Sequence, residues 1–565
     1  MYRRRPYSGR PGHPVRAAAL SLALAAAWAS ALLPAQAHAQ SERESLESVR
    51  QTTLALIELL VQNGTLPRDK ADALLAEARR RADAAVAEAA KGEPPPVRVQ
   101  FVPQVVRDQI RNEVREEVLA RAKLERWGVP NATAEWTDRI AIEGEVRMRS
   151  QVDRLGTGNP SPQDFLNASL GGTTRAADFA TGTATGLATA STQDDRDRLR
   201  LLARLGINAK VSDSVTAGLR LATGSATDRV SNRQTLGQNF NRYQFLIDRA
   251  FVKFEPTEWA SVSAGRFANP WFATEMLWSD NLNFDGVSAT VKMPARATST
   301  VLPFATMGFF PLRESIAGRR SRSLVGAQVG AQWEASERTR VRFGVAHYRY
   351  NDLEGRVDPD FDAVSGAGRS YGQFEYEAGL RQRGNTLFLT NNPAEIAGGL
   401  TPDKARWGLA SRFQPTALTM AAEFSHFSPF VIGLSGEYVR NGAFDRQEIL
   451  ARTGVNLTDA RNYGAGMRAT FGAQQVRNAG EWQLSLGYRW LGSDAVPDAF
   501  VDGDLGLGGT NVRGVTAGVV YGVARDTQLG LRLLSGRTIS SPTMQAGLKD
   551  RYSVFSMQVD LNVRF

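Results

Sequence analysis

The last residues of the chain, Phe555–Phe565, read FSMQVDLNVRF, and this stretch decides the fold class. Every second side chain, starting with Phe555 and ending with Phe565, is apolar, and every side chain between them is polar or charged. Successive side chains of a β-strand point to opposite faces, so this strand has one apolar and one polar face. The apolar face suits either a second sheet or lipid, and the polar face suits water.

Three stretches upstream repeat this alternation and place charged residues on the polar face: residues 139–149, 196–210 and 215–222. A charge at every second position is costly against a dry core, because each charge would need a buried partner. The same charges cost little when they face a water-filled channel. The pattern therefore favours a barrel with a wet interior over a soluble sandwich.

From residue 139 to residue 565 we predict an all-β transmembrane fold, an antiparallel outer-membrane β-barrel of sixteen strands. Short connections such as 211–214 alternate with long ones such as 151–195, as a barrel of this class requires. The stretch 405–425 is long enough for another hairpin, so eighteen strands remain an alternative. The predicted strands begin near residues 139, 196, 215, 242, 260, 286, 298, 323, 339, 404, 430, 462, 481, 513, 528 and 552.

Aromatic residues near the predicted strand ends are typical of the girdles that mark the membrane interfaces of a barrel. Ordinary core packing is the alternative interpretation of the same residues. The set comprises Trp259, Trp271, Phe272, Trp278, Tyr348, Tyr350, Trp482, Tyr488 and Trp490.

The N-terminus has the pattern of an export signal. Residues 1–16 hold five Arg and no acid, an apolar run covers 17–33, and Ala37-His38-Ala39 forms a small-x-small cleavage site. We predict a signal peptide over residues 1–39, with an uncleaved anchor helix as the alternative.

Residues 40–138 show helical periodicity. We predict a helical segment in the periplasm, with apolar spacings of three and four that suit a coiled coil. A small helical domain that covers its own core is the alternative for this segment.

The predicted barrel holds 48 Lys and Arg against 41 Asp and Glu, and 43 of the 48 cations are Arg. Rows of inward Arg suit carboxylates, phosphates or sulfates, because a guanidinium keeps its charge and its fork geometry. We therefore predict a weak preference for anions. In the alternative interpretation, inward Arg pair with inward acids and brace the wall. The candidate pore-lining residues are Arg147, Arg149, Arg198, Arg200, Arg204, Lys210, Arg220, Arg340, Arg342, Glu143 and Glu145.

The composition excludes several kinds of chemistry. The chain has no Cys, which excludes disulfide scaffolds and thiol catalysis. It has no phosphate-loop, His-Glu-x-x-His or Gly-x-Ser-x-Gly motif. His347 and His426 would each need a neighbouring carboxylate to support a barrel enzyme. We predict no enzyme, no cofactor, no metal and, because the mature chain has only 63 basic against 58 acidic residues, no nucleic-acid partner.

Several stretches resemble the putative porin family of Gram-negative outer membranes: residues 54–78, 106–118, 135–149, 248–272 and 284–286. The terminal Phe565 resembles the aromatic ending that the barrel-assembly machinery reads. The resemblance implies a diffusion porin in the cell outer membrane, often a homotrimer, with its N-terminal segment in the periplasm. The implied partners are small hydrophilic solutes or anions, outer-membrane lipid and the assembly machinery. An outer-membrane anchor or adhesion protein that uses its long loops is the alternative function.

Overall fold

The computed structural model describes residues 139–565 apart from 160–175, 178–192, 238, 295–299, 316–320, 359–371, 378, 401–403, 458–460 and 540–551. Ahead of residue 139 it describes Ala76, Arg80 and Thr137. The signal peptide over 1–39 and nearly all of the helical segment over 40–138 lie outside the described residues and stay predictions.

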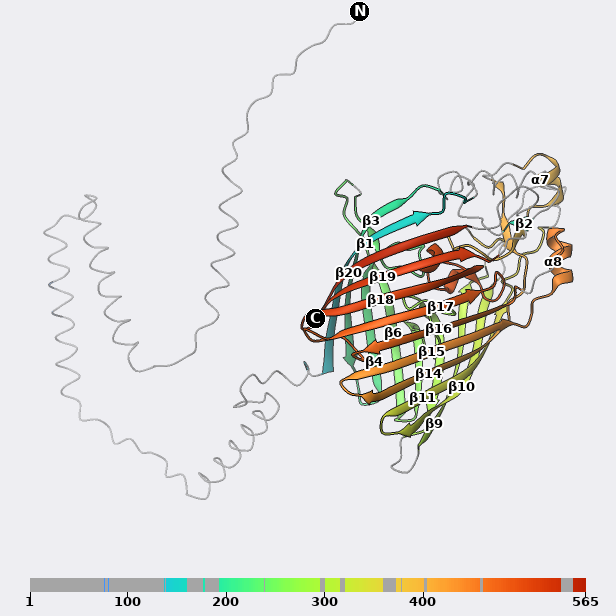
Figure 1. Ribbon diagram of the computed structural model, residues 1–565. Coiled ribbons are helices and arrows are strands. Elements are labelled where there is room, and N and C mark those ends of the chain that lie inside the picture. Colours follow the sequence, from blue (N-terminus) through green and yellow to red (C-terminus); the bar gives the residue numbers. More distant parts are fainter. Residues whose placement is uncertain are drawn as a thin grey trace, which may run out of the picture. The chain divides into compact units, whose positions relative to one another are not determined.

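Within the described residues, sixteen long strands form a closed antiparallel β-barrel (Figure 1). Consecutive strands pair, and β1 also pairs with β20, with Glu145 opposite Arg564, so the barrel has no free edge. The strands are β1 (Ile140–Leu155), β3 (Arg196–Lys210), β4 (Val215–Thr223), β6 (Phe245–Thr257), β7 (Ala260–Ala268), β8 (Asn283–Lys292), β9 (Val301–Arg313), β10 (Arg322–Ser336), β11 (Thr339–Asn351), β14 (Pro415–Phe427), β15 (Phe430–Asn441), β16 (Tyr463–Gly472), β17 (Trp482–Leu491), β18 (Val512–Ala524), β19 (Thr527–Thr538) and β20 (Ser553–Arg564).

The predicted strand starts are confirmed to within three residues, with one exception. The strand expected near residue 404 begins at Pro415, as β14. The residues ahead of it form β13 (Trp407–Leu409), which belongs to a separate sheet with β12 (Leu387–Leu389) and β2 (Ala176–Ala177). The alternative of eighteen strands is therefore wrong, because the extra strand-forming residues pair outside the barrel.

The two ends of the barrel differ in their connections. At one end, called here the short-turn end, residues 211–214 and the pair 525–526 join neighbouring strands. The opposite, long-loop end carries the connections 269–282, 352–414 and 492–511. The connection 352–414 contains α7 (Pro393–Ala397), and the connection 492–511 contains η3 (Asp498–Phe500) and η4 (Leu505–Leu507). The connection 442–462 at the same end contains α8 (Arg446–Thr453), and β5 (Gln234–Thr235) in the connection 224–244 pairs with β3. The loop predicted from residue 151 starts later, because β1 continues to Leu155.

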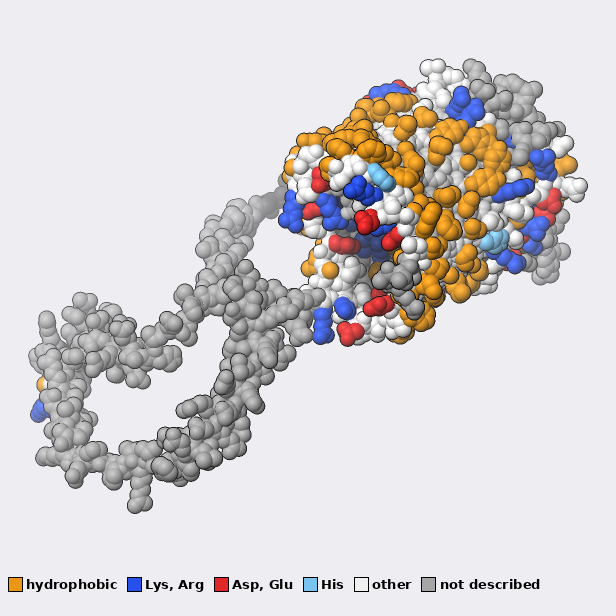
Figure 2. All heavy atoms as spheres, turned by 60° about the horizontal axis from the view of Figure 1, so that its bottom comes forward, with side chains coloured by type: hydrophobic (Ala, Val, Ile, Leu, Met, Phe, Trp, Pro, Cys, Tyr) orange, Lys and Arg blue, Asp and Glu red, His pale blue; other side chains and the backbone are white. Residues whose placement is uncertain are grey.

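The outer face of the wall is apolar and exposed. On β1, Ile142, Val146 and Met148 are exposed, whereas Arg149 on the opposite face is 2% exposed. Figure 2 shows hydrophobic side chains over the wall, and acidic and basic side chains in the hollow at the end that faces the viewer. The alternation read from the sequence therefore separates a lipid-facing surface from a charged interior.

The residues of the predicted aromatic girdle differ in exposure, and the prediction is wrong for those that are buried. Trp259 and Tyr488 are exposed, as an interfacial position requires. Trp271, Trp278 and Tyr348 are buried and belong to the main hydrophobic cluster. Trp271 and Trp278 belong to the 269–282 loop, and their rings contact that of Tyr348 on β11, with centroid distances of 5.2 and 5.3 Å. They are buried because that loop turns into the barrel.

Candidate functional site

Arg149 and Arg200 face each other on the inner wall. Arg149 on β1 lies opposite Asp560 on β20 and opposite Arg200 on β3. Arg149 donates hydrogen bonds to both carboxylate oxygens of Asp560, at 2.7 and 2.8 Å. Arg200 donates only to Gln151 and Ser231, at 3.4 and 3.2 Å, and no carboxylate oxygen of the described residues lies within 4.0 Å of it. Like charges that face each other across strands repel, and within the described part of the chain the charge of Arg200 is offset only at longer range, by Asp504 and Asp228.

Four other predicted arginines have the contacts expected of wall braces. Arg147 and Arg204 bind Glu145 at 2.5 and 3.2 Å. Arg198 pairs with Asp153, and Arg220 pairs with Asp248. All four pairs join neighbouring strands or residues of one strand, so these charges are largely compensated within the wall. Their role as pore-lining residues stays a prediction.

The remaining candidates lie elsewhere. Lys210 pairs with Asp213 in the turn after β3, at 3.8 Å. Arg340 is half-exposed and has Glu423 at 3.6 Å, and Glu143 is exposed. Arg342 has no carboxylate oxygen of the described residues within 4.0 Å, and its guanidinium carbon lies 4.2 Å from the ring centre of Phe272. The spacing of residues in the sequence predicts which side chains lie on the polar face of a strand. It does not predict at which end of the barrel each side chain lies.

The 269–282 loop folds into the barrel and is fixed to the wall on two sides. The backbone N–H of Phe272 donates to Gln328 on β10 at 2.8 Å, and the Gln328 amide donates back to the Phe272 carbonyl at 2.7 Å. Thr274 donates its N–H and its hydroxyl to the buried Glu437 on β15, at 3.1 and 2.6 Å. This loop therefore narrows the interior at a fixed position.

The 269–282 loop also brings an acid to the arginines of the far wall. Glu275 lies 3.5 Å from Arg489 on β17 and 3.9 Å from Arg468 on β16. On the other side, Asn281 accepts a hydrogen bond of 2.7 Å from Arg204. The loop thus contacts charged side chains of two separate parts of the wall.

The 492–511 loop carries an acid, Asp504, that pairs with three arginines of the interior. Asp504 lies 3.0 Å from Arg532 on β19, 3.3 Å from Arg149 on β1 and 3.4 Å from Arg233. Burial alone would raise the pKa of Asp504, but the positive field of these guanidinium groups holds it well below the ordinary range. Asp504 therefore stays ionised and acts as the common counter-ion of three arginines.

The 352–414 loop packs against the 492–511 loop through buried polar groups. The Tyr376 hydroxyl donates to Asp498 at 2.6 Å, and Thr386 donates its N–H and hydroxyl to Asp494 at 3.0 and 2.6 Å. Burial raises the pKa of Asp498 to about 6, against the lowering effect of the hydrogen bond from Tyr376. These contacts hold two long loops together at the long-loop end.

Sequence reasoning did not find the residues of these inward loops. Asp504 and Arg149 are 355 positions apart in the chain, and no local pattern connects them. One usable signal was present, since Asp494, Asp498, Asp502 and Asp504 lie close together in the 492–511 loop of an otherwise basic barrel. A cluster of acids in a connection beside arginine-bearing strands favours a loop that turns inward.

A family model described as "Putative porin" matches residues 50–565. The match covers most of the chain, so the protein belongs to this porin family. The family and the closed barrel make it an outer-membrane diffusion channel. No curated protein matches the chain significantly.

Three solved structures illustrate the range of similar barrels. OprB of Pseudomonas putida is 9% identical, with a TM-score of 0.41, and the alignment covers 76% of this chain and 96% of that one. The channel DcaP of Acinetobacter baumannii is 10% identical, with a TM-score of 0.36 and coverages of 77% and 100%. An anion-selective porin from Comamonas acidovorans is 11% identical, with a TM-score of 0.37 and coverages of 75% and 99%.

Proposed function

We propose that this outer-membrane diffusion channel passes small hydrophilic solutes and favours anions over cations of the same size. The observation that supports the preference is a set of inner-wall arginines without a carboxylate partner. Besides Arg200 and Arg342, the set includes Arg249, which donates to Asn283 at 2.8 Å and has no carboxylate oxygen of the described residues within 4.0 Å. Unpaired guanidinium groups in a narrow wet lumen attract anions.

Several acids without a cationic partner contribute little to the charge of the lumen, because their side chains are buried. Glu437, Asp494 and Asp498 are 4%, 0% and 1% exposed. Each accepts hydrogen bonds from loop residues, so these carboxyl groups hold the loops and do not face the solute. These three carboxyl groups therefore add little negative charge to the water-filled part of the inner wall.

Permeation of sugars that share a size and differ in charge tests this preference. Liposomes that contain the purified mature protein are loaded with glucuronate, glucose or glucosamine, and the efflux rates are compared. We expect glucuronate to leave fastest and glucosamine slowest. Equal rates for the three sugars, or the reverse order, would contradict the anion preference.

We also infer that the barrel has no catalytic role. His347 contacts the hydroxyl of Thr416 at 2.9 Å, and neither His347 nor His426 has a carboxylate oxygen of the described residues within 4.0 Å. A histidine without an acid to orient it lacks the arrangement that barrel hydrolysis would need. The adhesion alternative gains no support either, since the 269–282 and 492–511 loops turn into the barrel.

We also propose the partners of this channel: outer-membrane lipid, further copies of the chain and the barrel-assembly machinery. The exposed apolar wall suits outer-membrane lipid, and a homotrimer follows from the family resemblance. Phe565 directly follows β20 and exchanges backbone hydrogen bonds with Gly144 on β1, at 2.7 and 3.1 Å. Its side chain is exposed. An exposed terminal aromatic side chain suits recognition by the barrel-assembly machinery.

A further inference from the structure

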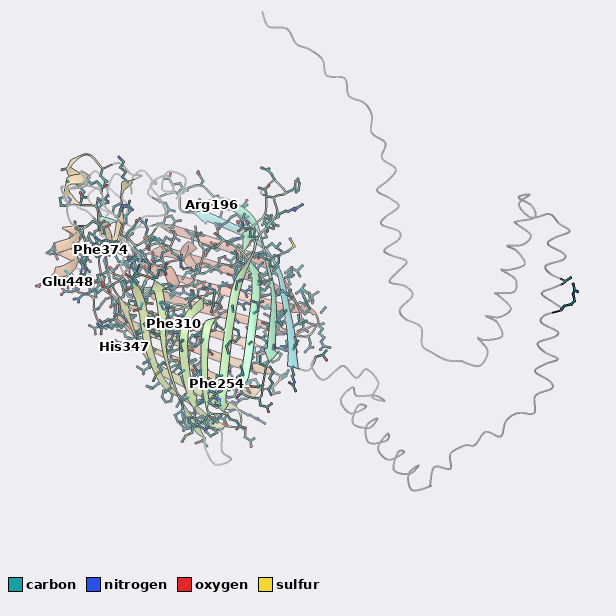
Figure 3. The ribbon with its side chains drawn as sticks, turned by 180° about the vertical axis from the view of Figure 1, so that it is seen from behind. Arg196, Phe254, Phe310, His347, Phe374 and Glu448 are labelled. Atoms are coloured by element: carbon teal, nitrogen blue, oxygen red, sulfur yellow. The ribbon has the colours of Figure 1, made fainter. Side chains whose placement is uncertain are left out.

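A cavity lies at the long-loop end, between strands β1 and β3 and four loops. Its volume is about 420 Å³. Its walls come from Gln151 on β1, from β3, from residues 227–233, from Asn281, from residues 379–382 and from the 492–511 loop. Figure 3 shows Arg196, one of the lining residues, at this end of the barrel, while Phe254 lies toward the other end.

The cavity is strongly basic. Six arginines and three aspartates line it. The aspartates are already engaged: Asp504 by its three arginines, Asp502 by Arg489 at 3.5 Å, and Asp228 by the backbone N–H groups of Val230 and Ser231. Of these counter-ions, Arg233 lines the cavity, whereas Arg149, Arg532 and Arg489 lie outside its lining. With six arginines against three aspartates, the lining itself has an excess of positive charge.

Three of the lining arginines, Arg196, Arg200 and Arg229, have no carboxylate oxygen of the described residues within 4.0 Å. Arg200 is held by Gln151 and Ser231, and its Nε atom is buried with no hydrogen-bond acceptor. Arg229 donates only to backbone carbonyl groups, at 3.0 and 2.6 Å, and is otherwise exposed. Arg200 belongs to the barrel wall and Arg229 to a loop, so the two cations approach the cavity from different elements.

The lining between the arginines includes hydrocarbon. Val230, Leu380, Ala499 and Leu507 face the cavity. The volume of about 420 Å³ is also many times the share of one water molecule, roughly 30 Å³. A bare inorganic anion would leave most of this space, and the apolar lining, without contacts.

We propose that this cavity binds a small organic dianion, a short carbon chain with an acidic group at each end, between Arg200 and Arg229. Each guanidinium takes one acidic group through charge-assisted hydrogen bonds, and the apolar side chains contact the carbon chain between them. The inference rests on the proposed function, because an anion-favouring channel would deliver this ligand to the cavity. The cavity then acts as a first binding step for such solutes.

The test is calorimetric titration of the folded mature protein in detergent with succinate as the probe. Butyrate, with one acidic group, and sulfate, without a carbon chain, are the comparison ligands. We expect saturable succinate binding that is roughly tenfold tighter than binding of either comparison ligand, a difference of about 1.4 kcal/mol.

Two variants locate the site. Arg200→Gln and Arg229→Gln are each expected to weaken succinate binding roughly tenfold. Arg446→Gln is the matched control, because Arg446 is exposed on α8 at the same end and does not line the cavity. Arg229→Gln changes an exposed loop residue, so it decides the question even if the Arg200 variant folds poorly.

Three results would overturn the inference: no saturable succinate binding, sulfate binding as tight as succinate binding, or unchanged affinity in the Arg229 variant. Sugar efflux separates this failure from failure of the proposed function. Fast glucuronate efflux without succinate binding removes only the cavity proposal. Succinate binding with equal efflux of the three sugars removes only the anion preference.

Discussion

At the scale of single residues, Arg200 and Asp504 contribute opposite charges to the lumen. Arg200 is a cation that faces another cation and has no acid of its own, whereas Asp504 is an anion shared by three arginines. The electrostatics of the channel therefore depend on a few residues more than on the total charge of the barrel. Substitutions at these two positions should shift ion selectivity in opposite directions.

Arg200→Gln should reduce the preference for anions. The substitution removes an unpaired guanidinium and also relieves the repulsion with Arg149, so stability should stay equal or rise by about 0.5 kcal/mol. In planar bilayers with a KCl gradient, the reversal potential should move toward zero relative to the unchanged protein and to Arg446→Gln. An unchanged reversal potential would refute the role given to Arg200.

Asp504→Asn should increase the preference for anions and lower the stability of the loops. It removes the shared counter-ion of Arg149, Arg233 and Arg532, of which, among the described residues, Arg149 alone keeps a second pair, with Asp560. Breaking a buried ion pair costs on the order of 3 kcal/mol. Thermal unfolding followed by circular dichroism, together with the reversal potential, measures both effects.

Asp285→Asn is the control for this prediction. It breaks an exposed ion pair of 2.8 Å with Arg266, and exposed pairs contribute little. Equal melting temperatures for the two variants would contradict the account of Asp504.

At the scale of elements, the 269–282 loop depends on its anchor at Gln328. Gln328→Ala removes both side-chain hydrogen bonds to Phe272, each worth about 1 kcal/mol. We expect larger single-channel conductance and more open-channel noise, because the loop that narrows the lumen gains freedom. Gln332→Ala, on the same strand but bonded only to Glu334, should leave both quantities unchanged.

The contact between the 352–414 and 492–511 loops should strengthen as the pH falls. The pKa of Asp498 is raised from the ordinary 3.8 to about 6, so the folded loops bind its proton more tightly than the unfolded chain does. The stabilisation is full below about pH 4 and is lost as the pH rises through about 6.

Hydrogen exchange over residues 376–386 and 494–501, corrected for intrinsic rates, measures this contact. Protection should be higher at about pH 5 than at about pH 7.5, and Asp498→Asn should remove the difference. Protection that falls on acidification would contradict the assignment to Asp498.

The strands were predictable from the sequence, and the inward loops were not. Strand β20 alternates apolar and polar residues without a break, and that local pattern fixes its register and its outer face. The predicted start at residue 404 failed because β13 has strand-forming residues but pairs with β12 of the same 352–414 loop, outside the barrel. Asp504 meets its arginines through contacts between distant segments, which local periodicity does not encode.

At the scale of the whole molecule, three features combine into a channel. The barrel closes through β1 and β20, its outer wall is apolar and exposed, and its interior carries charged side chains narrowed by inward loops. An apolar exterior allows the barrel to sit in lipid, and the closed hydrogen-bond ladder satisfies the backbone there. The central claim is that this interior conducts and that its unpaired arginines favour anions.

Single-channel recording of the purified mature protein in planar bilayers, with the reversal potential measured under a KCl gradient, tests that claim most directly. The account predicts stepwise conductance and a reversal potential displaced toward that of chloride. A correctly folded barrel without conductance, or a reversal potential displaced toward that of potassium, would contradict it.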